Sequence, residues 1–529
     1  DVLGSRGLGD VYKRQKRRST LYSIVSTAII HGIQSVPISV EADVSDGLPV
    51  FEMVGFLASE VQEAKERVRT ALKNCGFALP PKHITINFTP ANIRKSGSGF
   101  DLPVAVAVLT AFGYIRQEMV REYFVAGEVG LNGKVQPVNG ILPMVAEAKE
   151  RGMKKCMVPW KNAGEAALVS DMQVFAVKNL ADAVNILNGN GEYFDTPYNI
   201  EEMQTGRILD FADVSGQELV KRACETAVSG MHNLLFVGPP GAGKTMIAER
   251  IPGILPSLNT KERMELSKIY SVCGLLEHKR GLMQERPFRA PHHTITPQGL
   301  AGGGAVPKPG EISLAHKGIL FLDELTEFQR ETLEILRQPM EEKKICIARL
   351  NASYEYPADF MLVAAMNPCK CGYYPDMQRC TCTSAAIDRY LRKVSRPLLD
   401  RIDICVEVPQ VRFRDLYNTG KSEKSEEIRA RVVRTQEIQK MRYRGENFCF
   451  NSHIPSSQIF EYCKLDKKQE IYMEQMYDKL NLTARTYHKI LRVARTLADM
   501  DESEQIKMSH LNEALCYRNI DKKFWEGMD

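Results

Sequence analysis

The stretch that decides the fold is LLFVGPPGAGKTMIAER, residues 234–250. Residues 238–245 fit the pattern G-x-x-x-x-G-K-[ST], with an apolar run before them and helix-forming residues after them. In such a loop the glycines let backbone N–H groups surround phosphates, and the helix N-terminus adds its dipole. Lys244 is expected to reach the terminal phosphates of ATP and Thr245 to hold Mg²⁺. The predicted nucleotide ligands are Gly238, Pro239, Pro240, Gly241, Ala242, Gly243, Lys244 and Thr245.

Two further apolar runs end in polar residues that suit the same chemistry. Residues 319–322, ILFL, lead into Asp323 and Glu324. At the end of a buried strand, Asp323 is expected to join the Mg²⁺ shell and Glu324 to activate the attacking water. Residues 361–366 lead to Asn367, which is expected to orient that water. A lone asparagine there is more often a turn residue, but the order of the three motifs favours a catalytic role.

Length and composition fit a globular protein of several domains. The chain has 529 residues, enough for about three domains of roughly 100–200 residues each. Hydrophobic residues make up 44% and charged residues 26%, which excludes collagen, coiled coil and disorder throughout. The longest uncharged apolar stretch, residues 102–115, is shorter than the ~20 residues of a membrane span. The 13 cysteines are too sparse for a disulfide scaffold. We therefore expect a soluble, cytoplasmic protein without a membrane partner.

Hydrophobic patterns divide the chain into predicted domains. Residues 36–44, VPISVEADV, alternate as a half-buried strand does, and Ser59 with Gln62 forms a capping-box pattern for a helix that ends at Gly76. The later continuous apolar runs are typical of parallel strands buried on both faces. The predicted divisions are a tail or artefact at 1–20, an α+β domain at 21–187, a linker at 188–210, an α/β nucleotide domain at 211–410 and a helical domain at 411–529.

The net charge gives no argument for a nucleic-acid or membrane surface. It is +5, but six basic and two acidic residues lie in residues 1–20. The rest of the chain carries 64 basic and 63 acidic residues. Residues 1–20 also lack an initiator methionine and any hydrophobic periodicity, so we exclude them from the prediction of the fold.

Several long motifs together resemble those of a known family. GPPGAGKT, ILFLDE, AAMN and SRPLLDRID (395–403) occur in the order seen in AAA+ ATPases, and residues 288–318 resemble the insert of the magnesium-chelatase-like group. With residues 39–55 and RKSGSGFDLP (94–103), the sequence is similar to the YifB/ComM family from about residue 21 to the end. The resemblance implies a P-loop AAA+ domain with a parallel sheet, followed by a helical lid.

The resemblance also implies a function. Members of the family form hexameric rings that couple ATP hydrolysis to branch migration or helicase action on branched or single-stranded DNA, in natural transformation and recombination. By position in their motifs, Arg401 would be the arginine finger and Arg485 the second sensor. Without the family, both would be interpreted as surface or salt-bridging arginines. A magnesium-chelatase-type motor subunit and a protein-remodelling ATPase without a DNA substrate remain as alternatives.

A predicted hairpin offers a DNA contact. The resemblance places a β-hairpin within residues 341–357, as in related replicative helicases. Lys343, Lys344 and Arg349 would then face a central pore and contact phosphates. The alternative is an ordinary solvated charged face.

A cluster of cysteines suggests a structural metal. Their spacing is C-x-C-x₈-C-x-C, and four thiolates can close a tetrahedral zinc site. Four free thiols are the alternative, because C-x-C is less typical of zinc than C-x-x-C. His292 and His293 are expected to belong to a polar network within the insert and not to the metal. The predicted zinc ligands are Cys369, Cys371, Cys380 and Cys382.

The first domain resembles a protease domain without its catalytic pair. Residues 94–143 are similar to the proteolytic domain of Lon proteases, a ribosomal-protein-like fold, and include GEVGLNGKVQPVNGI at 127–141. Gly99 stands where the nucleophilic serine would be, and Leu142 where the lysine base would be. Because a serine nucleophile requires a positioned base, we expect an inactive scaffold or interaction domain. The absence of a serine and a lysine at these two positions also argues against the interpretation of the chain as an ATP-dependent protease.

Overall fold

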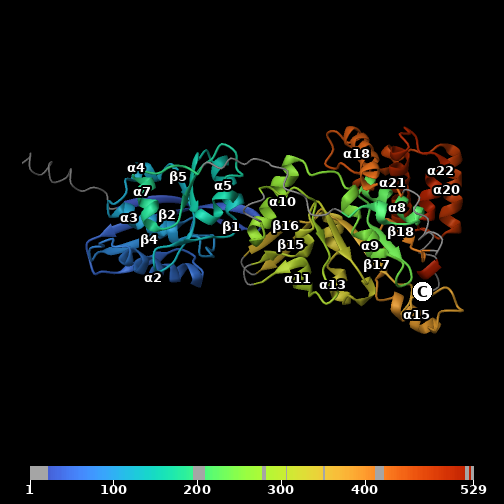
Figure 1. The fold of residues 1–529 in the computed structure, drawn as a ribbon, viewed down its shortest axis with the longest axis horizontal. Coiled ribbons are helices and arrows are strands. Elements are labelled where there is room, and N and C mark those ends of the chain that lie inside the picture. Colours follow the sequence, from blue (N-terminus) through green and yellow to red (C-terminus); the bar gives the residue numbers. More distant parts are fainter. Residues whose placement is uncertain are drawn as a thin grey trace, which may run out of the picture. The chain divides into compact units, whose positions relative to one another are not determined.

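The computed structural model divides the protein into two compact units (Figure 1). One comprises Asp1–Met203 and Arg263–Met283, and the other Gln204–Glu262 and Gln284–Asp529. The predicted tail at 1–20 and most of the predicted linker lie outside the described residues. No helix in the described part of the chain is both long and apolar enough to span a bilayer. The described residues are 22–194, 209–276, 281–304, 307–349, 352–411, 422–518 and 523–525.

The first unit is built on a seven-stranded mixed sheet of order β3-β4-β2-β1-β5-β8-β9. β1, β2 and β4 pair antiparallel, whereas β5, β8 and β9 continue the sheet in parallel pairs. β6 and β7 form a separate small hairpin. The strands are β1 Tyr22–His31, β2 Gln34–Ser45, β3 Phe51–Val54, β4 His83–Thr89, β5 Tyr123–Val125, β6 Glu128–Val129, β7 Val135–Gln136, β8 Lys155–Pro159 and β9 Gln173–Val177.

Helices pack against this sheet and complete an α+β domain. Every residue of α3 is buried, which fits its almost uninterrupted apolar sequence. The helices are α2 Ser59–Asn74, α3 Asp101–Ala111, α4 Gln117–Val120, α5 Ile141–Glu150, η1 Trp160–Asn162, α6 Ala163–Ala166 and α7 Leu180–Leu187.

The predicted strand and helix of the first domain are both present, with one local error. In β2, the alternate residues Ile38, Val40, Ala42 and Val44 are buried, as the alternation predicted. The capping box at the start of α2 is wrong: Ser59 is already helical, and Ala58 precedes the helix in an extended conformation without a side-chain cap. The helix therefore begins without a capping hydrogen bond from the serine hydroxyl.

A segment distant in sequence completes the first unit. α10, Thr260–Cys273, begins in the second unit, but residues 263–283 cluster with the first. The Ser271 hydroxyl donates to the carboxylate of Glu165, and the Gly140 N–H donates to the Ser271 carbonyl at 3.0 Å. Since Glu165 is buried, this hydrogen bond ties the inserted segment to the interior of the first unit.

The second unit contains a five-stranded parallel sheet of order β11-β14-β17-β10-β18. The predicted apolar runs form three adjacent strands, and all their residues are buried. Because parallel strands end at the same edge, the loops after β10, β14 and β17 lie at one edge. The strands are β10 Leu234–Val237, β11 Phe288–Arg289, β14 Ile319–Leu322, β17 Met361–Met366 and β18 Ile404–Glu407.

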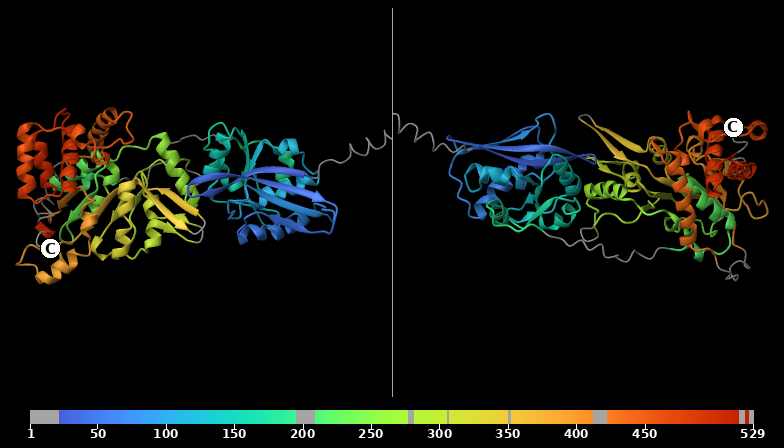
Figure 2. Two further views of the ribbon diagram at one scale, coloured as in Figure 1. Left: turned by 180° about the vertical axis from the view of Figure 1, so that it is seen from behind. Right: turned by 90° about the horizontal axis from the view of Figure 1, so that it is seen from above.

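Helices surround this sheet, and two small hairpins accompany it. Figure 2 shows the longer hairpin, β15 with β16, in yellow. The hairpin strands are β12 Gly302–Gly303, β13 Lys308–Pro309, β15 Lys344–Arg349 and β16 Ala352–Pro357. The helices up to β18 are η2 Phe211–Asp213, α8 Glu218–Gly230, α9 Lys244–Ala248, η3 Ile251–Ile254, α11 Pro297–Ala301, α12 Glu311–Leu314, η4 Leu325–Glu327, α13 Arg330–Glu334, α14 Arg337–Glu342, α15 Ser384–Leu391 and α16 Arg396–Leu399.

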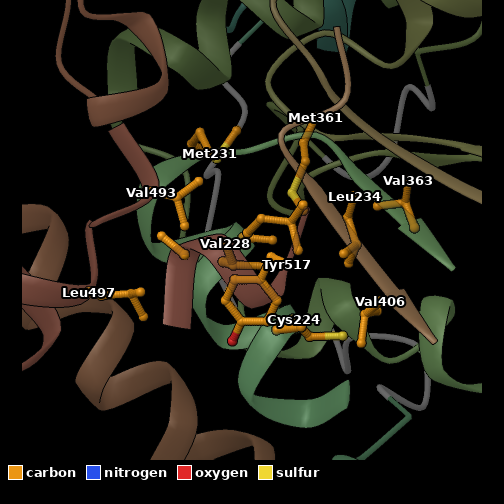
Figure 3. Packing of buried hydrophobic residues seen from close by; sticks show 14 of the residues in the cluster. Cys224, Val228, Met231, Leu234, Met361, Val363, Val406, Val493, Leu497 and Tyr517 are labelled. Carbon is orange, nitrogen blue, oxygen red and sulfur yellow. The ribbon is translucent and has the colours of Figure 1, made fainter. Parts of the chain in front are cut away.

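The C-terminal region is helical, as predicted, and shares a core with the sheet. Figure 3 shows Val493 and Leu497 of α21 near Cys224 and Val228 of α8 and the strand residue Leu234. The lid is therefore packed against the nucleotide domain. Its helices are α18 Ser425–Arg442, η5 Asn451–His453, α19 Ile459–Tyr462, α20 Lys467–Lys479, α21 Ala484–Met500 and α22 Met508–Cys516.

Candidate nucleotide site

The loop between β10 and α9 has the backbone of a phosphate-binding loop. Gly241 and Gly243 have φ angles of 72° and 87°, a region that favours glycine. A Cβ at Gly238 would overlap the carbonyl of Val408. Glycine at these positions therefore lets the chain turn tightly at the end of β10, and α9 begins at Lys244 with its N-terminus toward the loop.

Lys244 lies inside the loop and contacts a second motif. Its ammonium group donates to the carbonyls of Gly238 and Pro239 at 2.7 and 2.9 Å and to Asn367 Oδ1 at 3.0 Å. Burial lowers the pKa of Lys244, while Asp323 and Glu324 oppose that shift. The structure thus brings the predicted phosphate lysine and the predicted water-orienting asparagine together.

Thr245 and Asp323 form the second contact of the site. The Thr245 hydroxyl donates to Asp323 Oδ2 at 2.6 Å, and Asp323 Oδ1 accepts from the Glu324 N–H at 2.9 Å. Mg²⁺ prefers oxygen ligands and is held in many nucleotide sites by one or two protein side chains and phosphates. A hydroxyl and a carboxylate in contact at the mouth of a phosphate-binding loop fit that requirement.

Glu324 has a neighbour that sequence reasoning missed. Its φ of 52° turns the chain sharply after β14, and its side chain is exposed. Nδ1 of His293 lies 3.5 Å from Glu324 Oε2. His292, by contrast, contacts Thr294 at 2.9 Å within the insert, as expected of both histidines. His293 and Glu324 lie on elements that are far apart in sequence, so no local sequence pattern predicts their contact.

Arg401 and Arg485 converge on one carboxylate. Glu341 Oε1, at the end of α14, lies 2.9 Å from Arg401 Nη2 and 2.6 Å from Arg485 Nη2. Arg401 also donates to the carbonyls of Arg337 and Pro397. Among the described residues, the hydrogen bonds and ion pairs of these two arginines do not reach residues 238–245. Sequence reasoning proposed both arginines but not the glutamate that holds them.

The four clustered cysteines come together in the loop after Asn367. All four Sγ atoms lie within 4.8 Å of one another. Sγ of Cys369 lies 3.3 Å from that of Cys371 and 3.7 Å from that of Cys380. Four thiolates around zinc at about 2.3 Å would be about 3.8 Å apart. The arrangement therefore fits a tetrahedral metal site.

The three basic residues of the predicted hairpin have partners within the chain. Lys343, just before β15, lies 3.5 Å from Asp359, and Lys344 lies 2.9 Å from Glu355 across the hairpin. Arg349, at the end of β15, donates to the Gly304 carbonyl at 3.3 Å. Since Lys343 and Lys344 are paired with acids, Arg349 is the best placed of the three to meet a phosphate.

The protease-like positions of the first unit hold no catalytic pair. Leu142 is fully buried in α5, and its N–H donates to Glu165 Oε1 at 3.0 Å. Gly99 has no side chain to act as a nucleophile. The hydroxyl of nearby Ser98 donates to the Glu128 carboxylate. A serine–carboxylate contact without the lysine does not reproduce the base that a serine nucleophile requires.

Comparison with known protein families finds matches along most of the chain. Residues 210–416 match the family of magnesium chelatase, subunit ChlI, residues 40–162 match subunit ChlI of Mg-chelatase, and residues 422–518 match the ChlI C-terminal region. The match at 40–162 covers the central part of the first unit, and the other two cover the parallel-sheet domain and the helical lid.

Individual relatives define the family more closely. The chain is 40% identical to competence protein ComM of Haemophilus influenzae over 503 residues, which cover 94% of this chain and 97% of the relative. It is 40% identical to YifB of Escherichia coli with the same coverage. A shorter match, 29% identical over 138 residues, links 26% of the chain to 24% of Lon protease 2 of Bacillus subtilis. With its magnesium-chelatase-like nucleotide domain, the chain belongs to the ComM/YifB family of AAA+ ATPases.

Proposed function

We propose that this protein binds ATP with Mg²⁺ and works as a hexameric DNA motor, with branch migration or strand separation as its activity. The observation that carries the ATPase is the pair of contacts Lys244–Asn367 and Thr245–Asp323. In the proposed mechanism Lys244 neutralises phosphate charge, and Thr245 and Asp323 hold the metal. Glu324, oriented by His293, accepts a proton from the attacking water. Asn367 orients that water.

The proposed ring follows from the arginines. Arg401 and Arg485 both bind Glu341, and none of their hydrogen bonds or ion pairs among the described residues involves residues 238–245. An arginine that stabilises transferred phosphate charge can be supplied by another protein chain. In the proposed hexamer Arg401 leaves Glu341 and reaches the nucleotide of a neighbouring subunit, while Arg485 acts as the second sensor, and hydrolysis therefore depends on assembly.

The DNA substrate is supported by the family and by one residue of the hairpin. The relative from Haemophilus influenzae is named a competence protein, and the family resemblance implies action on DNA. Six copies of Arg349, one from each hairpin, would give a local positive ring although the overall charge is nearly balanced. Such a ring would provide a local site for DNA phosphates, although the chain as a whole has no excess of basic residues to bind duplex through many phosphate contacts.

The test is ATP turnover and junction processing by the purified protein. A four-way junction and single-stranded DNA should each stimulate ATPase, and ATP should convert the junction to forked products. Arg349→Ala should lose most of the stimulation and retain basal hydrolysis, with Lys308→Ala, an exposed lysine on β13, as the control. If no DNA changes the rate of ATP hydrolysis, the protein would still be an ATPase, but the proposal that DNA is its substrate would be refuted.

A magnesium-chelatase-type motor is the second candidate, favoured by the three family matches. It predicts stimulation by a partner protein with a porphyrin and none by DNA. The same ATPase assay with both kinds of addition decides between the two. The proposed cofactors are ATP, Mg²⁺ and one structural Zn²⁺ on the four cysteines.

A further inference from the structure

The four-cysteine loop is long and has no regular structure of its own. Between the end of β17 and the start of α15, residues 367–383 form neither helix nor strand. Loops of this length inside a compact domain are uncommon unless they carry a function or a cross-link. Here a metal on four thiolates would close the loop on itself and fix its path.

The cysteines are part of the domain interior. Cys369 is fully buried and Cys380 is 8% exposed. Both belong to the same buried cluster as Val237, Leu322 and Met366, the last residues of the three central strands. The Tyr374 N–H donates to Cys369 Sγ at 3.4 Å, a contact that stabilises a metal-bound thiolate. The part of the loop that carries Cys369 and Cys380 is therefore packed in the same core as the strands that carry the nucleotide motifs.

The loop also touches the phosphate-binding loop directly. Gly372 has a φ of 86°, and a Cβ added there would overlap the ring of Pro240. In the sequence Gly372 lies between Cys369 and Cys380, two of the four cysteines. Its N–H donates to the Cys369 carbonyl at 3.0 Å. The backbone next to Cys371 thus supports Pro240 from outside the loop.

A third link runs through Asn367. It lies two residues before Cys369 and accepts from Lys244 at 3.0 Å. The Gly238 N–H donates to the carbonyl of Met366 at 3.2 Å. A shift of the cysteine loop would therefore move both a wall of the phosphate-binding loop and the partner of its lysine.

We propose that zinc bound to Cys369, Cys371, Cys380 and Cys382 positions the phosphate-binding loop through Gly372 and Asn367, so that nucleotide affinity depends on zinc occupancy. The proposal rests on the proposed ATP site. Zinc here takes no part in hydrolysis. It holds the loop in the conformation that phosphates require, and its loss allows Pro240 and Lys244 to relax.

The first experiment measures zinc and ATP affinity together. Elemental analysis of the protein as purified should find about one zinc per chain. Chelation under reducing conditions, followed by removal of the chelator and addition of Mg²⁺, should weaken binding of a fluorescent ATP analogue about tenfold. Added Zn²⁺ should restore it. Zinc-loaded protein that binds no ATP would refute the proposed nucleotide site. Unchanged affinity after complete zinc removal would refute the coupling alone, and protein without zinc, or with iron instead, would refute the zinc assignment.

A substitution separates the contact from the metal. Gly372→Ala should retain zinc and weaken ATP binding, because its methyl group displaces Pro240. Gly445→Ala is the matched control, since Gly445 also has a positive φ, 99°, but no atom within 4 Å of an added Cβ. Thermal unfolding monitors folding of both variants. Equal ATP affinity in the two zinc-loaded variants would overturn the role of Gly372. Cys382→Ser should lose zinc and affinity together, whereas Cys449→Ser, at an exposed cysteine, should lose neither.

Discussion

The two halves of the proposed catalytic machinery differ in where their partners lie. On the nucleotide side, Lys244 contacts Asn367 and Thr245 contacts Asp323, so the motifs complete one another within a single chain. On the arginine side, Arg401 and Arg485 are both bound to Glu341. In the proposed mechanism the first half is already arranged to bind ATP, while the arginines of the second half have to exchange Glu341 for phosphates. If the proposed roles hold, ATP binding needs only contacts that one chain already makes, whereas ATP hydrolysis needs Arg401 to change its partner.

The largest expected effect separates binding from turnover on the nucleotide side. Lys244→Ala should abolish ATP binding, because its ammonium is the charge inside the loop. Glu324→Gln should retain binding and lower turnover at least about 100-fold, the usual range for loss of a general base. Equilibrium binding and phosphate release measure the two effects, with Glu331→Gln, an exposed glutamate of α13, as control. Wild-type affinity in Lys244→Ala would contradict the assignment of the site.

The arginine side is tested by mixing inactive variants. Arg401→Ala and Glu324→Gln should each be nearly inactive alone. If the arginine acts on a neighbouring subunit, mixed rings should regain part of the hydrolysis, since some interfaces combine an intact arginine with an intact glutamate. Titration of one variant into the other, with assembly followed by light scattering, gives the measurement. Mixed rings without any recovery would place Arg401 at its own chain's nucleotide.

The next prediction concerns His293, which lies beside Glu324 on the nucleotide side. Its Nδ1 lies 3.5 Å from Glu324, so His293→Ala should leave that carboxylate less well positioned. We expect kcat to fall about tenfold with little change in ATP affinity. His292→Ala is the matched control because that ring contacts Thr294 instead. Equal effects of the two substitutions would indicate that the insert, and not the contact with Glu324, is responsible.

Glu341 is expected to have a smaller effect of opposite sign. In the proposed ring its carboxylate would compete with phosphates for the arginines, and partly exposed ion pairs contribute about 0.2–1 kcal/mol each. Glu341→Gln should therefore raise ATPase of the assembled protein about two- to five-fold. Glu342→Gln, whose carboxylate accepts from Gln338, provides the control. A fall in turnover with intact assembly would mean that Glu341 positions the arginines for catalysis.

The last prediction concerns stability and not turnover, and it involves a histidine on the arginine side. His453 lines the same pocket as Arg401 and Arg485, and burial, with Lys343 nearby, lowers its pKa from 6.5 to about 3. Below pH 6.5 the unfolded chain binds a proton that the folded chain does not, so the unfolding free energy falls as the pH falls toward 3. This contribution is at most about 1.4 kcal/mol per pH unit. Urea unfolding at pH 7 and 5 should show a smaller difference for His453→Gln than for wild type.

The central strands and the phosphate loop were predictable, because a continuous apolar run followed by a short motif carries both the fold and the chemistry. The contacts that define the rest of the site were not. Glu341 and Arg485 are far apart in sequence, and the helix that carries Glu341 has no motif of its own. The capping box at Ser59 failed for a local reason: the pattern fits any serine three residues before a glutamine, whether or not the serine precedes the helix.

The shared helix α10 limits how this protein can be divided, in the laboratory or in evolution. Because residues 263–283 belong to the first unit while their flanks belong to the second, the chain passes between the units at three places. Leu266 and Ile269 on that segment are fully buried. A gene truncated at the linker would encode an ATPase that still carries this segment but lacks its packing partner. The protease-like unit therefore cannot be removed by a single cut in the chain without exposing the buried side chains of this segment.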